Sequence, residues 1–168
     1  MIRTGWQRTW VRCLTTVLTI AVMGMIFCFS MQDADRSDRT SGVLSQVILW
    51  VMYPEEDAAS MRQEQYGSVQ FAVRKTAHFS EYLLLGFLLR LCAESWIGHR
   101  VKNVRFPAAA ALAAGALYAG SDEIHQLAVS GRSGQWADVL VDCCGVLAGT
   151  ALGSLLIRKT KKRPDGTA

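Results

Sequence analysis

The stretch Tyr118-Ala-Gly-Ser-Asp-Glu-Ile-His-Gln126, followed by Gly131-Arg132, ends an alanine-rich apolar run with two acids, an imidazole and an arginine. Side chains three or four residues apart share one face of a helix, and four members of the stretch have this spacing: Tyr118, Ser121, Asp122 and His125. If the run crosses a membrane, these charges lie at its edge, where an unpaired charge is costly and usually functional. The stretch therefore predicts part of a polar site at a membrane edge, which other segments must complete.

Four apolar runs divide the 168-residue chain. The longest, residues 13–32, holds no charge over 20 positions, which is enough for about 30 Å of helix. Two more are uncharged over 16 and 15 positions, residues 106–121 and 143–157, and a weaker run at residues 76–93 carries histidine, glutamate and arginine. We therefore predict an all-α integral membrane protein with four transmembrane helices, at about residues 11–31, 74–94, 106–125 and 137–157.

Length and composition indicate one membrane domain, residues 10–157, followed by a basic cytoplasmic tail, residues 158–168. The first apolar run has a basic flank but no small-x-small cleavage pattern, and it is long for a signal peptide, so a retained anchor is expected. The five cysteines lie in or beside the apolar runs and form no CxxC pair. They are predicted to act as small apolar side chains and not as metal ligands or disulfides.

Basic residues predict the orientation of the chain. They cluster before the first predicted membrane helix, between the second and third, and after the fourth: Arg3, Arg8, Arg12, Arg100, Lys102, Arg105, Arg158, Lys159, Lys161, Lys162 and Arg163. The positive-inside rule then places both termini in the cytoplasm, with the lipid bilayer as the main partner. The net charge of +4 reflects the membrane topology. It does not indicate nucleic-acid binding, because the basic clusters are not part of a folded element that could recognise a nucleic acid.

The segment between the first two predicted membrane helices is too long for a simple turn. Apolar side chains repeat in it at helical spacing: Val43, Leu44, Val47, Ile48, Val51 and Met52. This pattern predicts an external amphipathic helix at about residues 41–53, at the outer interface or in a shallow re-entrant position. Such a helix either covers the outer mouth of the bundle or gates a substrate. The polar residues 55–67 are interpreted as a second short external helix.

Two other predicted membrane helices also carry polar residues at their outer ends. The second has a polar face at helical spacing, made of Arg74, His78, Glu81 and Tyr82. The fourth begins with two aspartates four residues apart, above three glycines that permit close helix contact: Asp138, Asp142, Gly145, Gly149 and Gly153. The distribution of basic residues and the number of predicted membrane helices place these polar helix ends on the same, outer side of the membrane. The predicted site contains His78, Glu81, Asp122, His125, Arg132 and Asp138, with Arg74, Tyr82 and Asp142 beside it.

Four ordered motifs resemble the VanZ-like family of bacterial membrane proteins. They are Arg-Lys-x-x-His-Phe-x-Glu-Tyr at 74–82, Ser-Asp-Glu-Ile-His-Gln at 121–126, Gly-Arg at 131–132 and Asp-x-x-x-Asp-x-x-Gly-x-x-x-Gly at 138–149. The resemblance spans about residues 10–157 and implies a cell-envelope protein associated with low-level resistance to teicoplanin-type glycopeptide antibiotics. It implies no particular reaction. The family often has asparagine where this chain has Asp142, so this chain places one more titratable group in the site.

The first functional interpretation of the site is catalytic. A divalent metal would use His78, Glu81, His125 and one of Asp122, Asp138 or Asp142. The substrate would be a lipid-linked envelope molecule, and Arg74 and Arg132 could clamp its phosphate, because the guanidinium fork suits such groups. No established metal-binding spacing such as HExxH occurs, so the cofactor stays unknown at this point.

Two other interpretations stay open beside catalysis. The outward-facing site could bind a lipid-linked cell-wall precursor or a glycopeptide, or serve a small proton-coupled transporter, which four short helices would build as a homo-oligomer. Alternatively, the charges only pair and set the register of the bundle, Glu81 with Arg132 or Asp122 with Arg74. In each case three charged side chains are expected to be solvated or to snorkel: Lys75, Arg90 and Glu123.

Overall fold

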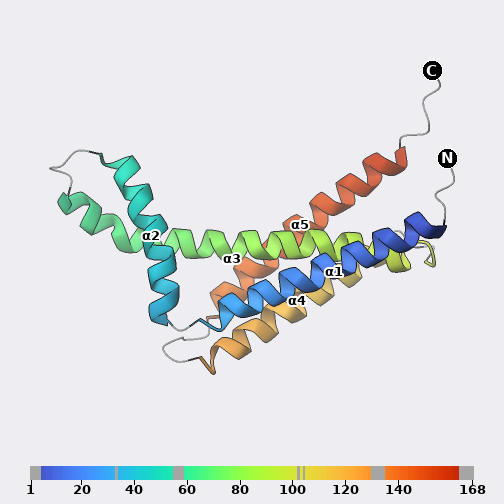
Figure 1. Cartoon of the computed structure of the whole chain (residues 1–168), viewed down its shortest axis with the longest axis horizontal. Helices are drawn as coiled ribbons and strands as arrows, with labels where there is room; N and C mark the ends of the chain where they lie inside the picture. Colours follow the sequence, from blue (N-terminus) through green and yellow to red (C-terminus); the bar gives the residue numbers. More distant parts are fainter. Residues whose placement is uncertain are drawn as a thin grey trace, which may run out of the picture.

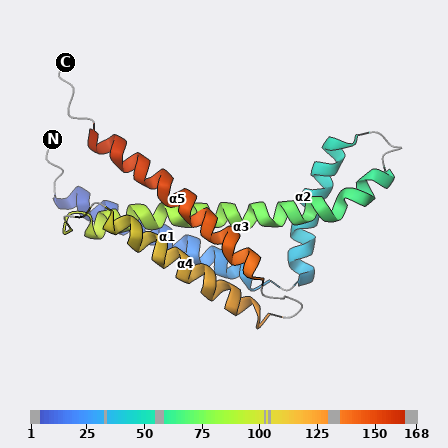
Figure 2. The ribbon, with the colours of Figure 1, turned by 180° about the vertical axis from the view of Figure 1, so that it is seen from behind.

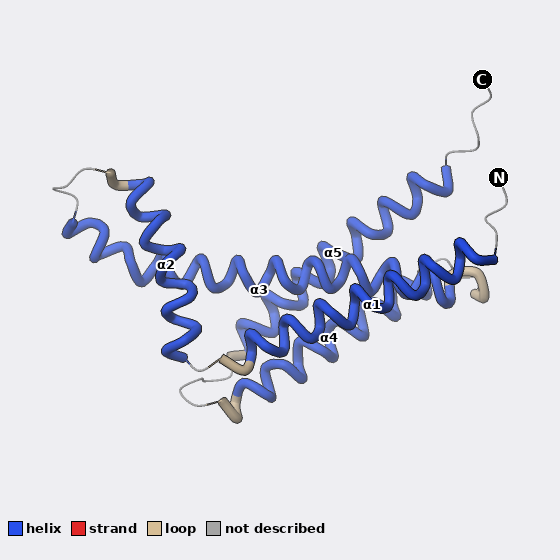
Figure 3. The backbone as a smooth tube through the Cα atoms, viewed as in Figure 1, coloured by secondary structure: helices blue, strands red, loops and turns tan. Residues whose placement is uncertain are grey.

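The chain folds into helices throughout the part that the computed structural model describes, which is residues 5–32, 34–54, 59–101, 103, 105–129 and 135–162. The helices are α1 Gly5–Ser30, α2 Ala34–Met52, α3 Ala59–Ile97, α4 Phe106–Gln126 and α5 Trp136–Lys162. No strand occurs in these ranges (Figure 3), so the predicted all-α class is confirmed. The predicted membrane helices overlap α1, the second part of α3, α4 and most of α5. The predicted amphipathic helix covers only the second part of α2, which already begins at Ala34.

The helix propensities of its own residues account for the formation of α4. Pro107 lies in the first turn, where its missing N–H is not needed and its fixed φ suits a helix. The alanines that follow are the best helix formers. The helix ends at Gln126, and the N–H of Leu127 donates to the carbonyl of Glu123 at 3.3 Å. The boundaries therefore fall within one residue of those predicted.

Helix α3 differs from its prediction, because it is one continuous helix of 39 residues. At 1.5 Å per residue it is about 58 Å long, which exceeds the thickness of a bilayer. The separate external helix predicted at residues 55–67 is wrong: residues 55–58 lie outside the described ranges, and Ala59 already begins α3. The chain from Ala59 to Ile97 contains no proline, and a glycine such as Gly67 costs only about 1 kcal/mol in a helix.

The bundle has two distinct ends (Figures 1 and 2). The start of α1, the α3–α4 connection and the end of α5 lie together at one end, which we call the basic end because it carries Arg12, Arg100, Arg105, Arg158 and Lys159. The α1–α2 and α4–α5 connections lie at the opposite end (Figure 1). There α2 crosses α3 and contacts it, and the first part of α3 projects beyond the other helices. Several acidic residues between α1 and the start of α3, Asp33, Asp35 and Glu55 to Asp57, lie outside the described side chains.

The contact between α3 and α5 depends on glycine. Gly149 lies so close to α3 that an added Cβ would collide with the backbone carbonyl of Leu83. An added Cβ on Gly145 would lie 2.6 Å from the carbonyl oxygen of Phe79, and one on Gly153 would touch the side chain of Arg90. The predicted role of this glycine stripe in close helix packing is therefore confirmed. The core beside it contains Ile26, Tyr82, Leu85, Ala119 and Val146.

Two of the described helices, α1 and α5, are long and apolar enough to cross a membrane, over Thr9–Ser30 and Trp136–Thr160. Helix α3 carries charged residues along its length, and α4 consists largely of weakly apolar alanine before it reaches its acids. Apolarity therefore does not by itself identify α3 and α4 as membrane spans. The prediction of four membrane spans is therefore not confirmed.

Arg90 corrects the expectation that this side chain snorkels to the surface. It is only 4% exposed, at the contact between α3 and α5. Its guanidinium donates to the hydroxyl of Ser154 at 2.9 Å and pairs with Glu94 at 2.9 Å. The room for the arginine comes from Gly153 on the facing helix. A buried charge of this kind is tolerated because its donors have partners.

Candidate functional site

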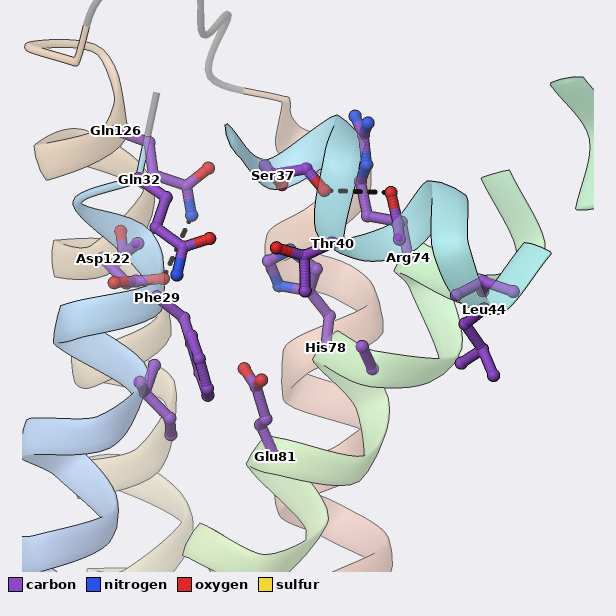
Figure 4. Close-up of a pocket in the computed structure, with 15 residues that line it drawn as sticks. Phe29, Gln32, Ser37, Thr40, Leu44, Arg74, His78, Glu81, Asp122 and Gln126 are labelled. Carbon is purple, nitrogen blue, oxygen red and sulfur yellow. Dashed lines mark hydrogen bonds between the residues drawn. The ribbon is translucent and has the colours of Figure 1, made fainter. Parts of the chain in front are cut away.

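A pocket of about 200 Å³ lies at the end of the bundle opposite the basic end. Helices α1, α2, α3 and α4 all contribute to its wall (Figure 4). Its polar lining consists of Ser30, Gln32, Ser37, Thr40, Ser41, Arg74, His78, Glu81, Asp122 and Gln126. Its apolar lining consists of Ile26, Phe29, Leu44, Val73 and Ala77. The pocket is thus amphiphilic, with the ionisable groups on α3 and α4 and much of the apolar wall on α1 and α2.

Helix α3 places His78 and Glu81 in the pocket, because residues three apart lie on one face. The carboxylate of Glu81 points into the space between α3 and the α1–α4 side (Figure 4). Behind His78 lies Asp142 of α5, which is completely buried. The Nδ1 atom of His78 is 3.4 Å from Oδ1 of Asp142, so α5 supports the pocket without lining it.

Helix α4 contributes Asp122 and Gln126 from the opposite wall (Figure 4). Gln126 donates from Nε2 to Oδ2 of Asp122 at 3.1 Å, whereas Oδ1 of Asp122 is buried and has no hydrogen-bond partner. Beneath them, the hydroxyl of Tyr82 is buried beside Asp122 and likewise has no hydrogen-bond partner. The floor of the pocket is therefore rich in polar atoms that the protein itself does not satisfy.

Two adjacent cations of α3 are engaged by different helices. Arg74 pairs with Asp38 of α2 at the rim of the pocket. Lys75 pairs with Asp138 of α5, and both side chains are largely buried. The expectation that Lys75 is solvated is therefore wrong, because the start of α5 packs against this part of α3. The pairing of Asp122 with Arg74 does not form, since Asp122 bonds to Gln126 instead.

Glu123 is also not solvated, contrary to expectation. It is 7% exposed and accepts a hydrogen bond from the backbone N–H of Gln135, just before α5. The acid therefore ties the end of α4 to the start of α5. His125 does not line the pocket, because its ring packs against Phe27 of α1 with 4.8 Å between the ring centroids. Arg132 lies outside the described residues, so its pairing with Glu81 is not described.

The predicted site residues thus divide into three groups. Four of them line the pocket: Arg74, His78, Glu81 and Asp122. Tyr82, Asp142 and Asp138 lie behind or beside these on α3 and α5, and His125 lies apart. Among the described residues, no three His, Cys, Asp or Glu side chains gather closely enough to hold a metal ion. All five cysteines are free.

Sequence reasoning missed the residues that α1 and α2 contribute. These are Ser30 and Gln32 at the end of α1, and Ser37, Thr40 and Ser41 on α2. The signal on α2 was its polar face, which lies opposite the apolar positions at helical spacing. Gln126 could also have been found, because it lies four residues after Asp122 and so on the same face of α4.

Comparison with known proteins identifies the family of the chain. No curated protein and no solved structure matches the chain. Residues 15–157 match the VanZ/LLP1 family, and this range includes every element that builds the pocket. Together with the two apolar helices, the match indicates a membrane protein. Because the match covers most of the chain and contains the four motifs, the protein belongs to the VanZ/LLP1 family.

Proposed function

We propose that this protein is a multi-pass envelope protein that binds the polar part of a lipid-linked envelope molecule in the pocket, and thereby contributes to glycopeptide resistance. The observation that carries the proposal is the amphiphilic lining, where Glu81 and Asp122 face apolar side chains such as Phe29 and Leu44. A head group would lie against α3 and α4, while an attached chain would follow α1 and α2. An entirely polar ligand would leave the apolar side chains of the pocket without a partner.

The position of the pocket at the edge of the membrane supports a lipid-linked ligand. Helix α4 has 21 residues, which makes about 31 Å of helix and matches the hydrocarbon core of a bilayer. With α1, α4, α5 and the second part of α3 as spans, both termini and the α3–α4 connection lie on one side. That side carries Arg12, Arg100 and Arg158, so the positive-inside rule makes it cytoplasmic. The pocket then opens on the outer side.

Helix α2 supports the same placement. Several of its apolar side chains are not covered by the bundle, and Val43, Val47 and Val51 are all more than half exposed. Its packed side instead holds Ser45 and Leu49, both buried against the protein. Exposed apolar side chains are stable in the outer part of the bilayer, where an amphipathic helix lies at the level of the head groups. This position puts α2 beside an incoming lipid-linked ligand.

Arg74 is the group best placed for a phosphate of such a ligand. It lines the pocket at its rim, where it pairs with Asp38, and its Nε atom is buried without a hydrogen-bond partner. A guanidinium can keep one carboxylate and still donate from Nε to a phosphate oxygen. We therefore propose that the phosphate lies at the rim and the remaining polar groups of the ligand lie deeper, between Glu81 and Asp122.

Resistance tests whether the pocket matters in the cell. The protein is expressed in a teicoplanin-susceptible bacterium, and the minimum inhibitory concentration is compared for the wild type, Glu81→Gln and Glu64→Gln. Glu64 is the matched control, because it is an exposed glutamate on the same helix outside the pocket. The proposal expects protection from the wild type and Glu64→Gln, and loss of protection from Glu81→Gln at equal membrane abundance. Full protection from Glu81→Gln, or none from the wild type, would overturn it.

Binding is tested directly with a photoreactive lipid-linked cell-wall precursor. The purified protein is reconstituted in nanodiscs, crosslinked and digested, and the labelled residues are compared with those labelled by a photoreactive phospholipid. The proposal expects the precursor, and not the phospholipid, to label pocket residues such as Phe29 and Leu44. Unlabelled precursor should compete for that labelling. Identical labelling by both probes would show that the pocket has no preference for the precursor.

Proton-coupled transport is a second candidate, favoured by one observation. Polar side chains remain buried along the α3–α5 contact below the pocket: Asp142 is fully buried, Thr150 is 3% exposed and Arg90 is 4% exposed. Buried polar groups inside a membrane bundle are typical of ion and proton pathways. A path of this kind would need several copies of so small a bundle, so transport predicts a homo-oligomer. A pH-sensitive dye in proteoliposomes tests it: Asp142→Asn must slow the collapse of an imposed proton gradient.

A further inference from the structure

Buried polar atoms without hydrogen-bond partners concentrate behind the pocket. They include Nδ1 of His78, the hydroxyl of Tyr82, Oδ1 of Asp122 and both carboxylate oxygens of Asp142. Buried polar atoms are normally hydrogen-bonded, and leaving one unsatisfied costs free energy. The cluster spans α3, α4 and α5, so it is a feature of the assembled bundle and not of one helix.

Asp142 is the member of this cluster for which burial without a partner costs the most free energy. The side chain is completely buried, and an isolated carboxylate in such surroundings is very costly. The basic group that faces it at close range is Nδ1 of His78, 3.4 Å from its Oδ1. Lys75 is also nearby, but its ammonium is held by Asp138. Asp142 therefore either carries a proton itself or faces a protonated imidazole.

Both arrangements contain the same number of protons. A neutral Asp142 beside a neutral His78 has no net charge, and a charged Asp142 beside an imidazolium also has none. Removing the proton leaves the pair with one net negative charge, and adding a second leaves it with one net positive charge. Two further carboxyl groups, Glu81 of α3 and Asp122 of α4, line the pocket near the imidazole.

The imidazole connects this proton to the pocket. Its Nδ1 atom is buried towards Asp142, whereas the side chain as a whole is 14% exposed and lines the pocket (Figure 4). An imidazole has two nitrogens, so it can take a proton at one and release a proton at the other. His78 therefore both contacts Asp142 and lines the pocket.

We propose that His78 and Asp142 form a buried dyad that holds one proton at rest and exchanges it with the pocket through the imidazole. His78 is the residue that contacts the pocket contents, and Asp142 is a positioning residue that orients the ring and compensates its charge. The proton leaves from the ring nitrogen towards an acceptor oxygen in the pocket, while the Nδ1 side keeps its contact with Asp142. That the acceptor is a phosphate or hydroxyl oxygen of a ligand rests on the proposed function, whereas the dyad itself does not.

The resting proton is tested by spectroscopy on ligand-free protein in nanodiscs. Infrared spectra show whether Asp142 carries a proton, as a carboxylic acid band lost in Asp142→Asn, and nitrogen NMR shows whether His78 is an imidazolium. The chain has three histidines, so His→Gln variants assign the signals. One of the two protonated forms is expected at neutral pH. Glu64→Gln, which changes an exposed carboxyl group outside the pocket, should leave its signal in place. A neutral His78 together with no band that depends on Asp142 would overturn the proposal.

Proton exchange with the pocket is tested by transfer into deuterated buffer. In the wild type, the proton of the dyad should exchange quickly for deuterium, because the imidazole borders the pocket. His78→Gln should slow proton exchange at Asp142 by about tenfold or more. His99→Gln is the matched control, since His99 is exposed at the basic end, and should not slow it. Circular dichroism checks that each variant is folded. A dyad proton that stays unexchanged for hours in the folded wild type would indicate a sealed structural pair, even if the resistance assay succeeds.

Discussion

Lys75 of α3 and Asp138 of α5 form an ion pair that joins the two helices beside the pocket, with side chains only 17% and 12% exposed. Removing one partner leaves the other charge buried and unpaired. Asp138→Ala is therefore expected to lower the free energy of unfolding by about 2–3 kcal/mol, somewhat less than the loss of a partner in a fully buried pair. Denaturant unfolding of the detergent-solubilised protein, followed by circular dichroism, measures the change.

The rim pair serves as the control for this prediction. Arg74 and Asp38 have side chains that are 41% and 52% exposed, so Asp38→Ala should cost less than about 1 kcal/mol. Exchanging the charges, Lys75→Asp with Asp138→Lys, should recover part of the stability lost in Asp138→Ala. Equal losses for Asp138→Ala and Asp38→Ala would contradict the importance of burial at the inner pair.

Gly149 offers a prediction about packing. An added methyl group would collide with the backbone carbonyl of Leu83, which cannot move aside without bending α3. Gly149→Ala is therefore expected to destabilise the fold by about 1–3 kcal/mol, the range found for overpacked cores. Thermal unfolding monitored by circular dichroism measures this.

A glycine with open space around it provides the control. Gly24 of α1 has no atom within 4 Å of the position that a Cβ would take. Since alanine is the better helix former, Gly24→Ala should be neutral or stabilising by about 0.5–1 kcal/mol. If both substitutions had the same effect, the α3–α5 contact would not be as close as the structure describes.

Trp50 reports on the surroundings of α2. Its side chain is 57% exposed beside other apolar groups, and the guanidinium of Arg62 lies 4.7 Å from its ring centroid. In the proposed arrangement α2 lies at the level of the lipid head groups, and this ring then contacts lipid. In a variant that keeps Trp50 as its one tryptophan, lipids brominated near the head group should quench the tryptophan fluorescence strongly. Lipids brominated deep in the acyl chains should quench it less. Quenching by aqueous iodide alone would place α2 in water.

The four-span arrangement predicts where the end of the chain lies. Green fluorescent protein fused after α5 should be fluorescent, and alkaline phosphatase fused there should be inactive, because the proposed arrangement places the basic end in the cytoplasm. The same pair of reporters fused after α4, at Val129, should give the opposite result, since this position lies at the pocket end. Equal results at both positions would mean that α5 does not cross the membrane.

The sequence by itself determined where most of the helices lie and predicted four of the residues that line the pocket, Arg74, His78, Glu81 and Asp122. Helix formation depends on near neighbours, so the proline and alanines of α4 and the apolar run of α1 predict their own structure. Helical spacing is likewise local. It placed His78 and Glu81 on one face of α3 and predicted the packing role of Gly149 before any tertiary contact was known.

Only the tertiary structure decided which charged groups meet. Arg74 and Lys75 are neighbours in sequence, yet they pair with Asp38 of α2 and Asp138 of α5, because the two helices pack on different sides of α3. The burial of Arg90 likewise depends on a glycine of α5 more than sixty residues away. Spacing along one helix cannot specify such contacts, since they are set by how separate helices pack. The close approach of His78 to Asp142 is decided at the same level.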